Sequence, residues 1–473
     1  MKIMLFAPEL FLGLGALALL FLSTGKAVGQ KARSLAVFVA VAEVVLCALC
    51  LNQNGELFYG AYKVDLFSQL VKLATSAGLA AILLFATQLK DVEEEIRAEY
   101  YVFLLVGTLG LLLLASSVEL LTIFISLELS SFSLYLLVPM RSDRTGTRIQ
   151  MESAIKYILF GVVATGVMLF GMSYMYGLTG STYLAKLVPA LSAMQGSVAA
   201  MAAIAMVLGG FFFKLAVFPF HFWSPDVYQG ASNETTAFLS SVPKVAAVAL
   251  LIRIASMINP GDRHVVDMIV IFSVCSMFYG NIIALVQSDI KRMLGFSGIA
   301  HAGYVLIGLV TLQQTGFALS LYYIVGYLFM NIAAFVAICK VSQAGENLSV
   351  SDLNGLHKRS PLLALTLAVS MFGMAGLPPF VGFMGKFMLL ASAYKGGFLA
   401  LVILAAINTA ISIYYYLSVV KAVYTGESGN APAVSVDAMS KLVSVALIAL
   451  VVVLGIAPDA VIRVASDAVK AIL

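Results

Sequence analysis

Four charged residues lie inside long apolar stretches, where a charge is costly. Glu128 occurs in ISLELSSFSLY, Lys214 in GGFFFKLAVFPFHFW, Lys244 in SSVPKVAAVAL and Lys386 in AGLPPFVGFMGKFML. A lysine or an acid at the centre of a membrane helix costs about 2.5–3.5 kcal/mol on insertion scales. A chain that carries several such groups either pairs them or uses them, so we expect these four residues to carry the chemistry.

The chemistry that these residue types favour is proton transfer. Burial favours the neutral form of a lysine, whereas a carboxylate close by favours the charged form. Moving the carboxylate would therefore switch the lysine between holding and releasing its proton. We expect Glu128 and Lys214 to form such a switch, with Lys244 and Lys386 as the next stations of the relay. Sodium would instead favour clusters of oxygen ligands, which these stretches lack.

Three further residues, Lys156, His221 and His301, are secondary candidates. Lys156 is close to the start of its apolar stretch, so a structural partnership with an acid or an extension to the membrane interface is an equal alternative. Histidines can also cap and bridge helices without carrying protons. The three consecutive tyrosines at 414–416 are interpreted as packing and receive no role.

The composition indicates which elements must position these residues. Of the 473 residues, 61% are hydrophobic and 11% are charged, and the mean hydropathy is +1.01. Soluble domains average about 25% charged residues, so this chain has too few to cover soluble domains of its length. A membrane-crossing helix needs about 20 apolar residues, and lipid offers the backbone no other partner. The sequence therefore predicts an all-α polytopic membrane protein with about 14 transmembrane helices. The predicted spans lie near residues 3–22, 34–51, 67–89, 100–116, 118–139, 153–177, 199–220, 236–258, 266–286, 294–312, 317–340, 362–390, 397–424 and 440–458.

The basic residues between the spans predict the orientation. Of the 28 lysines and arginines, 15 fall on one side, including Lys291, and 9 on the other, including Lys72 and Arg253. The richer side is expected to be cytoplasmic, which places both termini on the periplasmic side. The net charge of +4 is spread over short loops and does not indicate nucleic-acid binding. Cys47 and Cys50 form a CxxC motif within an apolar run, which is typical of helix packing rather than metal or redox chemistry.

Two of the predicted spans are interrupted beside a lysine. Pro219 follows Lys214, and a proline removes a backbone hydrogen bond and clashes with the preceding turn. Lys214 and His221 would share one face only if the helix were continuous. The span that contains Lys386 is interrupted in the same way by GLPP at 376–379, 172 residues after the first lysine. We therefore expect helices 7 and 12 to be discontinuous in a duplicated architecture, which is typical of a transporter's ion path.

Several segments resemble a known family, the antiporter-like membrane subunits of respiratory complex I. The resemblance covers residues from about 100 to 425, and one departure follows Tyr228, where QGASNETTAF replaces a stretch that usually contains two prolines. The segments that carry the resemblance are SLELSSFSLY (126–135), IKYILFGVVATGVMLFGMSYMYGLTGSTYL (155–184), FKLAVFPFHFWSPDVYQGA (213–231), SDIKRMLGFSGIAHAGY (288–304) and SPLLALTLAVSMFGMAGLPPFVGFMGKF (360–387).

The resemblance implies a role for each candidate residue. Glu128 and Lys214 match the family's glutamate–lysine pair, Lys244 matches its connecting lysine and Lys386 its terminal lysine. The three secondary candidates match polar positions along a central water-lined axis.

The resemblance also implies the organisation of the chain. We expect two inverted five-helix repeats at 100–258 and 266–424, preceded by a three-helix segment at 1–99 and followed by a C-terminal helix and tail at 425–473.

The function implied is that of a non-redox, proton-translocating subunit of NADH:quinone oxidoreductase in a bacterial inner membrane. NADH, FMN, iron–sulfur clusters and quinone would then be bound by partner subunits, and the partners would be other membrane-arm subunits. Three alternatives stay open. One is a subunit of a multisubunit cation/proton antiporter or of a membrane-bound hydrogenase. Another is a self-standing secondary antiporter. The third is a structural subunit whose charges only hold helices together.

Overall fold

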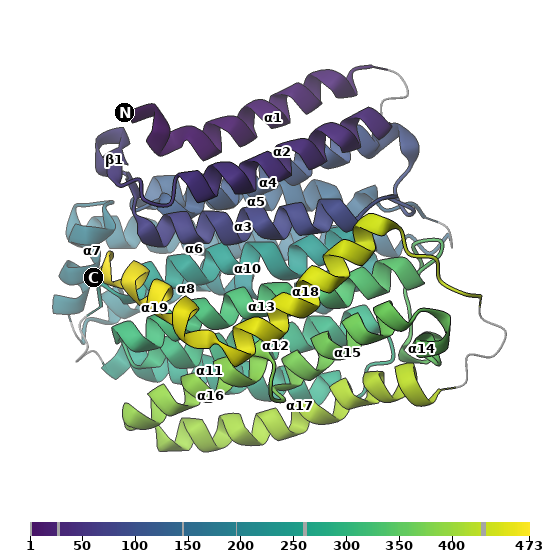
Figure 1. Cartoon of the computed structure of the whole chain (residues 1–473). Coiled ribbons are helices and arrows are strands. Elements are labelled where there is room, and N and C mark those ends of the chain that lie inside the picture. Colours follow the sequence, from purple (N-terminus) through teal and green to yellow (C-terminus); the bar gives the residue numbers. More distant parts are fainter. Residues whose placement is uncertain (1, 26–28, 144–145, 195, 259–262, 427–431) are drawn as a thin grey trace.

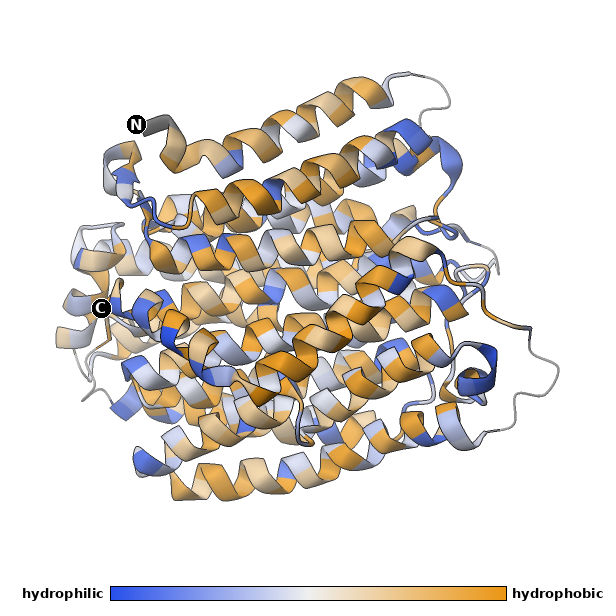
Figure 2. Ribbon diagram, viewed as in Figure 1, coloured by the Kyte–Doolittle hydropathy of each residue, from blue (hydrophilic) through white to orange (hydrophobic). Residues whose placement is uncertain are grey.

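A computed structural model of the chain describes residues 2–25, 29–143, 146–194, 196–258, 263–426 and 432–473. These residues form a bundle of helices whose long axes run roughly in one direction (Figure 1). Hydrophobic residues cover the length of the bundle, while hydrophilic residues gather mostly at its two ends (Figure 2). This distribution is that of a multi-pass membrane protein, because the apolar band matches the hydrocarbon layer.

The first segment consists of three long helices and a hairpin. The hairpin joins the second helix to the third, and its two strands pair antiparallel, with Gly55 opposite Val64. The elements are α1 (Ala7–Ser23), α2 (Gly29–Leu49), β1 (Gly55–Leu57), β2 (Tyr62–Val64) and α3 (Leu66–Phe85).

Two groups of helices with the same order follow, each with a fourth helix that is divided in two. The inverted relation between the groups stays a prediction. The first group contains α4 (Arg97–Ser116), α5 (Leu120–Leu137), α6 (Ile149–Thr179), the short α7 (Leu184–Ala193), α8 (Val198–Leu215), α9 (Trp223–Gly230) and α10 (Asn233–Ala255). The second contains α11 (Arg263–Ala284), α12 (Ile290–Val310), α13 (Gln314–Val341), the single turn α14 (Leu356–Arg359), α15 (Pro361–Ala375), α16 (Val381–Lys395) and α17 (Leu399–Thr425).

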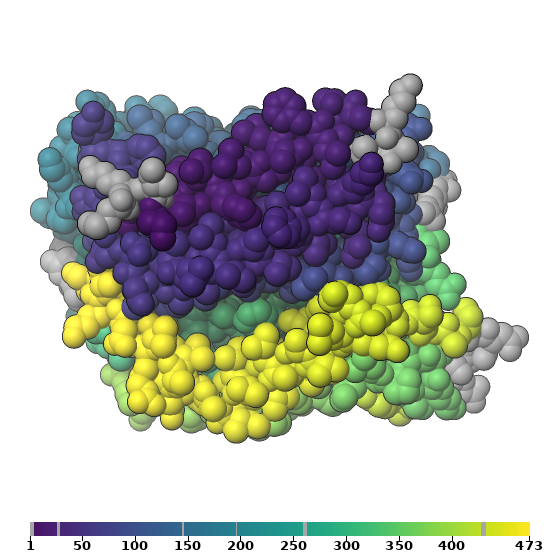
Figure 3. Space-filling view, turned by 45° about the horizontal axis from the view of Figure 1, so that its top comes forward, coloured from purple at the N-terminus to yellow at the C-terminus, as the bar shows by residue number. Residues whose placement is uncertain are grey.

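The chain ends in two further helices that lie against the first segment. Helix α18 (Ala438–Ile456) crosses the bundle obliquely, and α19 (Pro458–Lys470) follows it. Figure 3 shows α18 and α19 in yellow beside the first three helices in purple, so both ends of the chain cover one face of the molecule. The start of α1 and the end of α19 lie at the same end of the bundle (Figure 1), as an even number of crossings requires.

One of the 14 predicted spans is made of two short helices instead of one long one. Within the described residues, 13 helices are long and apolar enough to cross a membrane. Helices α15 and α16 have only 15 residues each, and together they occupy the place of the predicted span near 362–390. The predicted span near 199–220 is also shortened, because α8 ends at Leu215.

Several helices begin where a side chain satisfies a free backbone N–H group. Asp65 caps α3 in a capping box with Ser68, and Ser197, Ser232 and Asp289 cap α8, α10 and α12. Such caps satisfy N–H groups that have no partner within the helix. The spans predicted near 100–116 and 118–139 are separate helices, and Glu119 caps the second of them, α5, since its carboxylate accepts from the Thr122 N–H at 2.9 Å.

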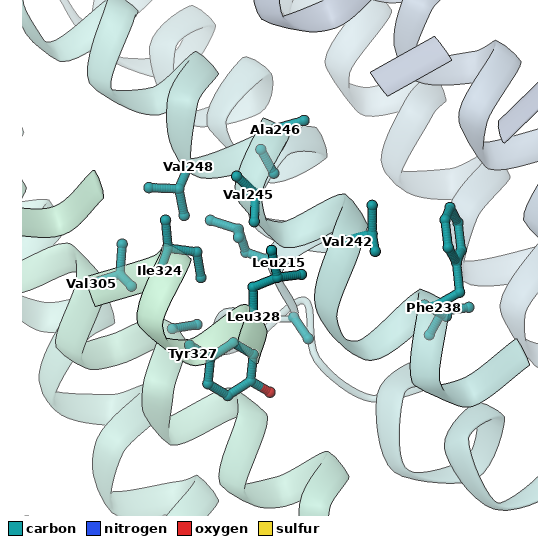
Figure 4. Close-up of a cluster of buried hydrophobic side chains, with 14 of the residues drawn as sticks. Leu215, Phe238, Val242, Val245, Ala246, Val248, Val305, Ile324, Tyr327 and Leu328 are labelled. Carbon is teal, nitrogen blue, oxygen red and sulfur yellow. The ribbon is translucent and has the colours of Figure 1, made fainter. Parts of the chain in front are cut away.

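The core lies where α10, α12 and α13 meet. In their most apolar 18-residue windows, 94%, 100% and 83% of the residues are buried, against 33% for α2 and α11. Figure 4 shows part of this core, where Leu215 of α8 gathers with Val242 and Val245 of α10 and with Tyr327 and Leu328 of α13. The three central helices therefore have no lipid-facing side, and polar groups on them must find partners within the protein.

Candidate functional site: a buried row of lysine, histidine and tyrosine

The first break in the bundle positions Lys214. Helix α8 ends because Ala216 adopts a left-handed conformation with φ 59°, and the chain resumes a helix only at Trp223. The Trp223 indole N–H donates to the Phe213 carbonyl at 2.9 Å, which satisfies one of the carbonyls freed at the helix end. Lys214, 4% exposed, donates to the hydroxyls of Ser131 at 3.1 Å and Ser130 at 3.4 Å.

The expected partner of this lysine, Glu128, lies close by but does not touch it. Its carboxylate accepts from the Thr165 hydroxyl at 2.7 Å, and among the described residues no ion pair joins it to Lys214. Glu128 is half-buried and lines an open groove of about 560 Å³ between α5 and α6, with Phe132 and Leu169 among the other lining residues. The direct carboxylate–ammonium contact implied by the switch is thus replaced by two serine hydroxyls on the same helix as Glu128.

Lys244 lies in the core, on α10. Its ammonium donates to the Gly298 carbonyl of α12 at 3.3 Å and lies 5.2 Å from the centre of the Tyr327 ring. A Cβ atom at Gly298 would lie 2.7 Å from this ammonium and 3.1 Å from the Tyr327 hydroxyl. Glycine at this position therefore makes room for the lysine, and the Tyr228 hydroxyl lies on the same side, 3.9 Å from that point.

His301 is held one turn further along α12. Its Nδ1 atom lies 2.6 Å from the Tyr323 hydroxyl and its Nε2 atom 3.0 Å from the Tyr416 hydroxyl. The imidazole ring also lies 4.8 Å from the Tyr327 ring, centre to centre. A histidine with a hydroxyl on each nitrogen can take up a proton on one side and release one on the other.

The second break positions Lys386. Helix α15 ends at Ala375, because Gly376 adopts a left-handed conformation with φ 85°, and Lys386 of α16 donates to the carbonyls of Met374 at 2.9 Å and Ala375 at 3.3 Å. Its ammonium lies 4.7 Å from the centre of the Tyr304 ring, within the range of a cation–π contact. The ammonium therefore has no carboxylate among its hydrogen-bond acceptors. Both acceptors are backbone carbonyl oxygens at the C-terminal end of a helix, where the helix dipole is negative.

These contacts form one row through the second half of the bundle. Gly298, His301 and Tyr304 are three residues apart on α12, so they follow one another along one face of that helix. Lys244 contacts the first of them, Lys386 contacts the last, and His301 lies between the two. In the rest of this article, the buried row means this set of residues and the hydroxyls on it: Lys244, Gly298, His301, Tyr304, Tyr323, Tyr327, Tyr416 and Lys386.

Sequence reasoning missed the tyrosines of the row. Tyr416 was interpreted as packing, yet it bonds His301, and its neighbour Tyr415 donates to the Asn281 side chain at 2.9 Å. Tyr414, by contrast, is 70% exposed. A run of three tyrosines on one helix points in three directions about 100° apart, so the residue type alone does not tell which of them faces inward. The three-residue spacing of Gly298, His301 and Tyr304 is the sequence signal that could have found the row.

The remaining secondary candidates lie away from the row. Lys156 forms ion pairs with Glu152 and Asp226, both at 2.7 Å, and is 38% exposed, so it belongs to a network near one end of the bundle rather than to a central axis. Asp226 also binds Arg292 at 2.6 Å. His221 is buried in the connection between α8 and α9, against the rings of Phe218 and Tyr279, and neither ring nitrogen has a hydrogen-bond partner among the described residues.

Three basic residues that were assigned to loops are buried in helices instead. Lys72 of α3 is paired with Glu9 at 2.8 Å, Arg253 of α10 with Asp65 at 2.9 Å, and Lys291 of α12 donates to the Ala231 carbonyl at 2.8 Å. They lie within two turns of a helix end, where hydropathy does not separate a loop from a buried turn. Setting them aside leaves the basic excess on the same side, and which side is cytoplasmic stays a prediction.

Comparisons with known proteins agree with this architecture. Residues 117–412 match the family model described as NADH:quinone oxidoreductase/Mrp antiporter, TM. The chain is 50% identical to NADH-quinone oxidoreductase subunit N 2 of Opitutus terrae, over 96% of this chain and 95% of that protein. It is 43% identical to the protein of the same name from Syntrophobacter fumaroxidans, over the full length of both.

Solved structures share the fold over nearly the whole chain. A chain of respiratory complex I from Thermus thermophilus, solved with bound aureothin, is 30% identical, with a TM-score of 0.83 over 97% of this chain and 99% of that one. A chain of the Mrp complex from Dietzia sp. is 20% identical, with a TM-score of 0.88 over 99% and 97%, which shows a common fold. The family match and the curated relatives together establish that this chain belongs to the antiporter-like membrane subunits of the NADH:quinone oxidoreductase/Mrp antiporter family, as a member of the subunit N type.

Proposed function

We propose that this chain translocates protons within the membrane arm of a bacterial NADH:quinone oxidoreductase. Its partners are other membrane-arm subunits, and quinone reduction elsewhere in the complex drives it. The names of its relatives support the assembly, and the buried row supports the chemistry. NADH, FMN, iron–sulfur clusters and quinone are bound by partner subunits in this proposal, and the chain contributes side chains only.

The continuity of the buried row is the observation that carries the proposal. Between Lys244 and Lys386, successive groups are in ring contact through Tyr327, His301 and Tyr304, with distances of 4.7–6.5 Å to the ring centres. Histidine and tyrosine side chains can both donate and accept a proton, and a lysine can accept one when it is neutral. A row of such groups, with its side chains buried inside the bundle, can pass a proton from one group to the next.

The row does not continue from Lys244 to Lys214. Leu215 and Val245, the residues that follow the two lysines, belong to the same apolar cluster in Figure 4. Proton transfer between the two lysines therefore requires water to enter or side chains to move, and this step is where the relay can be gated. Glu128, held by Thr165 on the outer side of Lys214, is in our proposal the group whose movement changes the charge of that lysine.

Lys214→Ala and Lys386→Ala in the intact complex test the proposal, with assembly, NADH-to-quinone turnover and proton pumping measured on the same preparation. Positioned acid–base groups contribute about 10²–10⁴-fold to rates, so we expect an assembled enzyme in which turnover and pumping both fall about tenfold or more. Lys395→Ala, at an exposed position on the same helix as Lys386, is the matched control and leaves both unchanged.

Other outcomes separate the alternatives. Full turnover and full pumping in assembled Lys214→Ala and Lys386→Ala complexes would contradict the relay. Loss of assembly without a pumping defect in the remaining complex would assign the lysines a structural role. Exchange of cations by the isolated chain in vesicles, with a response to sodium, would identify a self-standing antiporter.

A further inference from the structure

A second buried group of charges lies in the first three helices, apart from the buried row. Glu9 of α1, Glu43 of α2 and Lys72 of α3 are each at most 1% exposed. The Lys72 ammonium lies 2.8 Å from Glu9 Oε1, and the Tyr62 hydroxyl of β2 donates to the same oxygen at 2.7 Å. The Glu43 carboxyl accepts from the Cys47 thiol at 3.4 Å. We call these four polar residues, Glu9, Glu43, Tyr62 and Lys72, the α1–α3 cluster.

The charges of this cluster do not balance. If all three ionisable groups were charged, two carboxylates would face one ammonium, and a net negative charge would remain in a site closed to solvent. An uncompensated buried charge is so costly that the group takes up a proton instead. Glu9 has an ammonium at ion-pair distance and a hydroxyl donor, whereas Glu43 has only a thiol, a weak donor. Glu43 is therefore the carboxyl group that holds the proton.

The neighbouring ion pair shows what a purely structural solution looks like. Arg253 donates to both oxygens of Asp65, at 2.9 and 3.0 Å, and the Ser68 N–H donates to one of them at 2.8 Å. That pair is balanced in charge. In the α1–α3 cluster, by contrast, the second oxygens of Glu9 and Glu43 and the Lys72 ammonium have no hydrogen-bond partner among the described residues, and the same holds for the side-chain amide of Gln69 beside it.

These unpartnered atoms indicate a hydrated site. Gln69, Lys72 and Ser76 share one face of α3, since they are three and four residues apart. Ser76 lies 3.5 Å from the Cys47 sulfur, so this face is turned toward α2. Buried polar atoms of this kind normally bind internal water. Water among the two carboxyl groups would allow a proton to pass between them.

The cluster is close to one end of the bundle and is covered there by the hairpin. Glu43 and Lys72 are each six residues from the hairpin-side ends of their helices, which corresponds to about 9 Å at the rise of an α-helix. Tyr62 and Val64 of the hairpin pack with Leu5 in a small apolar cluster above the site. The Tyr62 hydroxyl passes through this cover to Glu9, so it connects the cluster to the end of the bundle where the chain begins and ends.

We propose that the α1–α3 cluster is a second proton-binding site of this chain, which holds one exchangeable proton on Glu43 and loads it from the end of the bundle covered by the β1–β2 hairpin. The site is separate from the relay of lysines. It holds its proton whether or not Lys214 and Lys386 carry out the function proposed above.

Infrared difference spectroscopy of the intact complex tests this inference, because a protonated carboxyl group has its own C=O stretching band. At neutral pH we expect Glu43→Gln to lose the intensity of one carboxylic acid. Lys72→Met removes the only positive charge of the cluster, so the second carboxylate also takes up a proton. We expect this variant to gain the intensity of one carboxylic acid. Glu95→Gln, which removes an exposed carboxylate, leaves the band unchanged. In D₂O the band of the parent complex shifts, since the proton exchanges.

Three results would overturn the inference. They are an unchanged carboxylic acid band in assembled Glu43→Gln, an unchanged band in Lys72→Met, and a parent band that does not shift in D₂O. If Glu43→Gln fails to assemble, the last two measurements still decide. Lys214→Ala and Lys386→Ala should leave the band as it is, so a failure of the relay is distinguishable from a failure of this site.

Discussion

Buried basic residues in this chain find three different kinds of partner. Arg253 has a carboxylate, Lys214 has two serine hydroxyls, and Lys386 has two backbone carbonyls and an aromatic ring. Only the first partner carries a full negative charge. The arginine is charged in any surroundings and its carboxylate partner compensates that charge, whereas the two lysines have neutral partners that are also compatible with a neutral amine.

Arg253→Met tests the structural role of the buried ion pair between Arg253 and Asp65. The substitution leaves Asp65, which is 1% exposed, as an uncompensated buried charge. Breaking a buried pair in this way typically costs about 3–5 kcal/mol, so we expect a large loss of assembled complex on native gels. The double variant Asp65→Asn/Arg253→Met removes both charges and should recover most of the assembly. A double variant no better than the single one would contradict this account.

Tyr416→Phe tests the second half of the buried row. The change removes the hydroxyl that bonds Nε2 of His301 and keeps the aromatic ring; the same hydroxyl also interacts with Ser297 and Tyr415. A hydrogen bond contributes about 0.5–1.5 kcal/mol, so we expect pumping and turnover to fall by up to about tenfold in a complex that assembles normally. Tyr414→Phe, two residues earlier and exposed, is the control. Equal pumping in the two variants would remove Tyr416 from the row.

At the residue scale, the sequence predicts which charged residues are buried in the bundle better than it predicts which groups contact them. Lys214, Lys244 and Lys386 stand out because each interrupts an apolar stretch, and the structure buries all three. Lys72 and Arg253 are equally buried but lie near helix ends, so their burial depends on which helices cover those ends. The partners of His301 come from α13 and α17, and their meeting depends on tertiary packing that a single sequence does not specify.

The two helix breaks are elements with a common design. Each upstream half ends in a residue with left-handed backbone, Ala216 with φ 59° and Gly376 with φ 85°. A helix end leaves its last carbonyls without partners inside the helix and carries partial negative charge. Lys214 lies in the last turn of α8, and Lys386 donates to the last carbonyls of α15. The prolines and glycines near both lysines made these breaks predictable, although the residues at which the helices end were not.

Gly376→Ala tests whether the second break positions its lysine. A left-handed conformation costs a residue with a Cβ atom about 1–2 kcal/mol, and the added Cβ would lie 3.1 Å from Lys386 Cδ. Gly397→Ala is a matched control, because its φ of 87° imposes the same strain but nothing lies within 4 Å of the added atom. We expect Gly376→Ala to lower pumping several-fold relative to Gly397→Ala. Equal pumping would mean that the break does not depend on this contact.

At the scale of the whole molecule, ion pairs at the bundle ends hold distant segments together. Asp437, which caps α18, binds Lys340 at the end of α13 at 2.7 Å, and Lys340 also donates to Thr87 after α3 at 2.9 Å. Burial alone would raise the pKa of Asp437, but the hydrogen bonds from Lys340 and Ser440 lower it from 3.8 to about 2. The C-terminal helices are thus fastened to both the first segment and the second group of helices.

The lowered pKa of Asp437 predicts how this fastening depends on pH. A carboxyl group whose pKa is lower in the folded state stabilises that state above its unfolded pKa, and the contribution is lost as the pH falls from about 4 to about 2. Because Asp437 is 38% exposed, solvent screening keeps the effect below about 1 kcal/mol. The melting temperature of Asp437→Asn should therefore lie slightly below that of the parent at neutral pH and approach it in acid. A difference that grows in acid would contradict this assignment.

Arg141 contacts three separate segments at one end of the bundle. Substitutions of Arg141 therefore test whether this single side chain holds those segments together. Its guanidinium contacts Asp91 and donates to the carbonyls of Gln229 at 2.9 Å and Gly345 at 3.0 Å. Asp91 lies before α4, Gln229 in the last turn of α9 and Gly345 after α13, so one planar group connects the first segment to both groups of helices.

A lysine cannot reproduce this pattern, because its donors lie on a single nitrogen whereas the guanidinium has five N–H groups in a fixed plane. Arg141→Ala removes the arginine partner of Asp91, which is 2% exposed, and we expect a loss of about 3–5 kcal/mol, seen as reduced assembly and a lower melting temperature. Arg141→Lys should recover only a minor part of it. Arg148→Ala, an exposed arginine seven residues further along, is the control for lost charge. If Arg141→Lys assembles like the parent, charge alone holds the loops, and the planar geometry is not required.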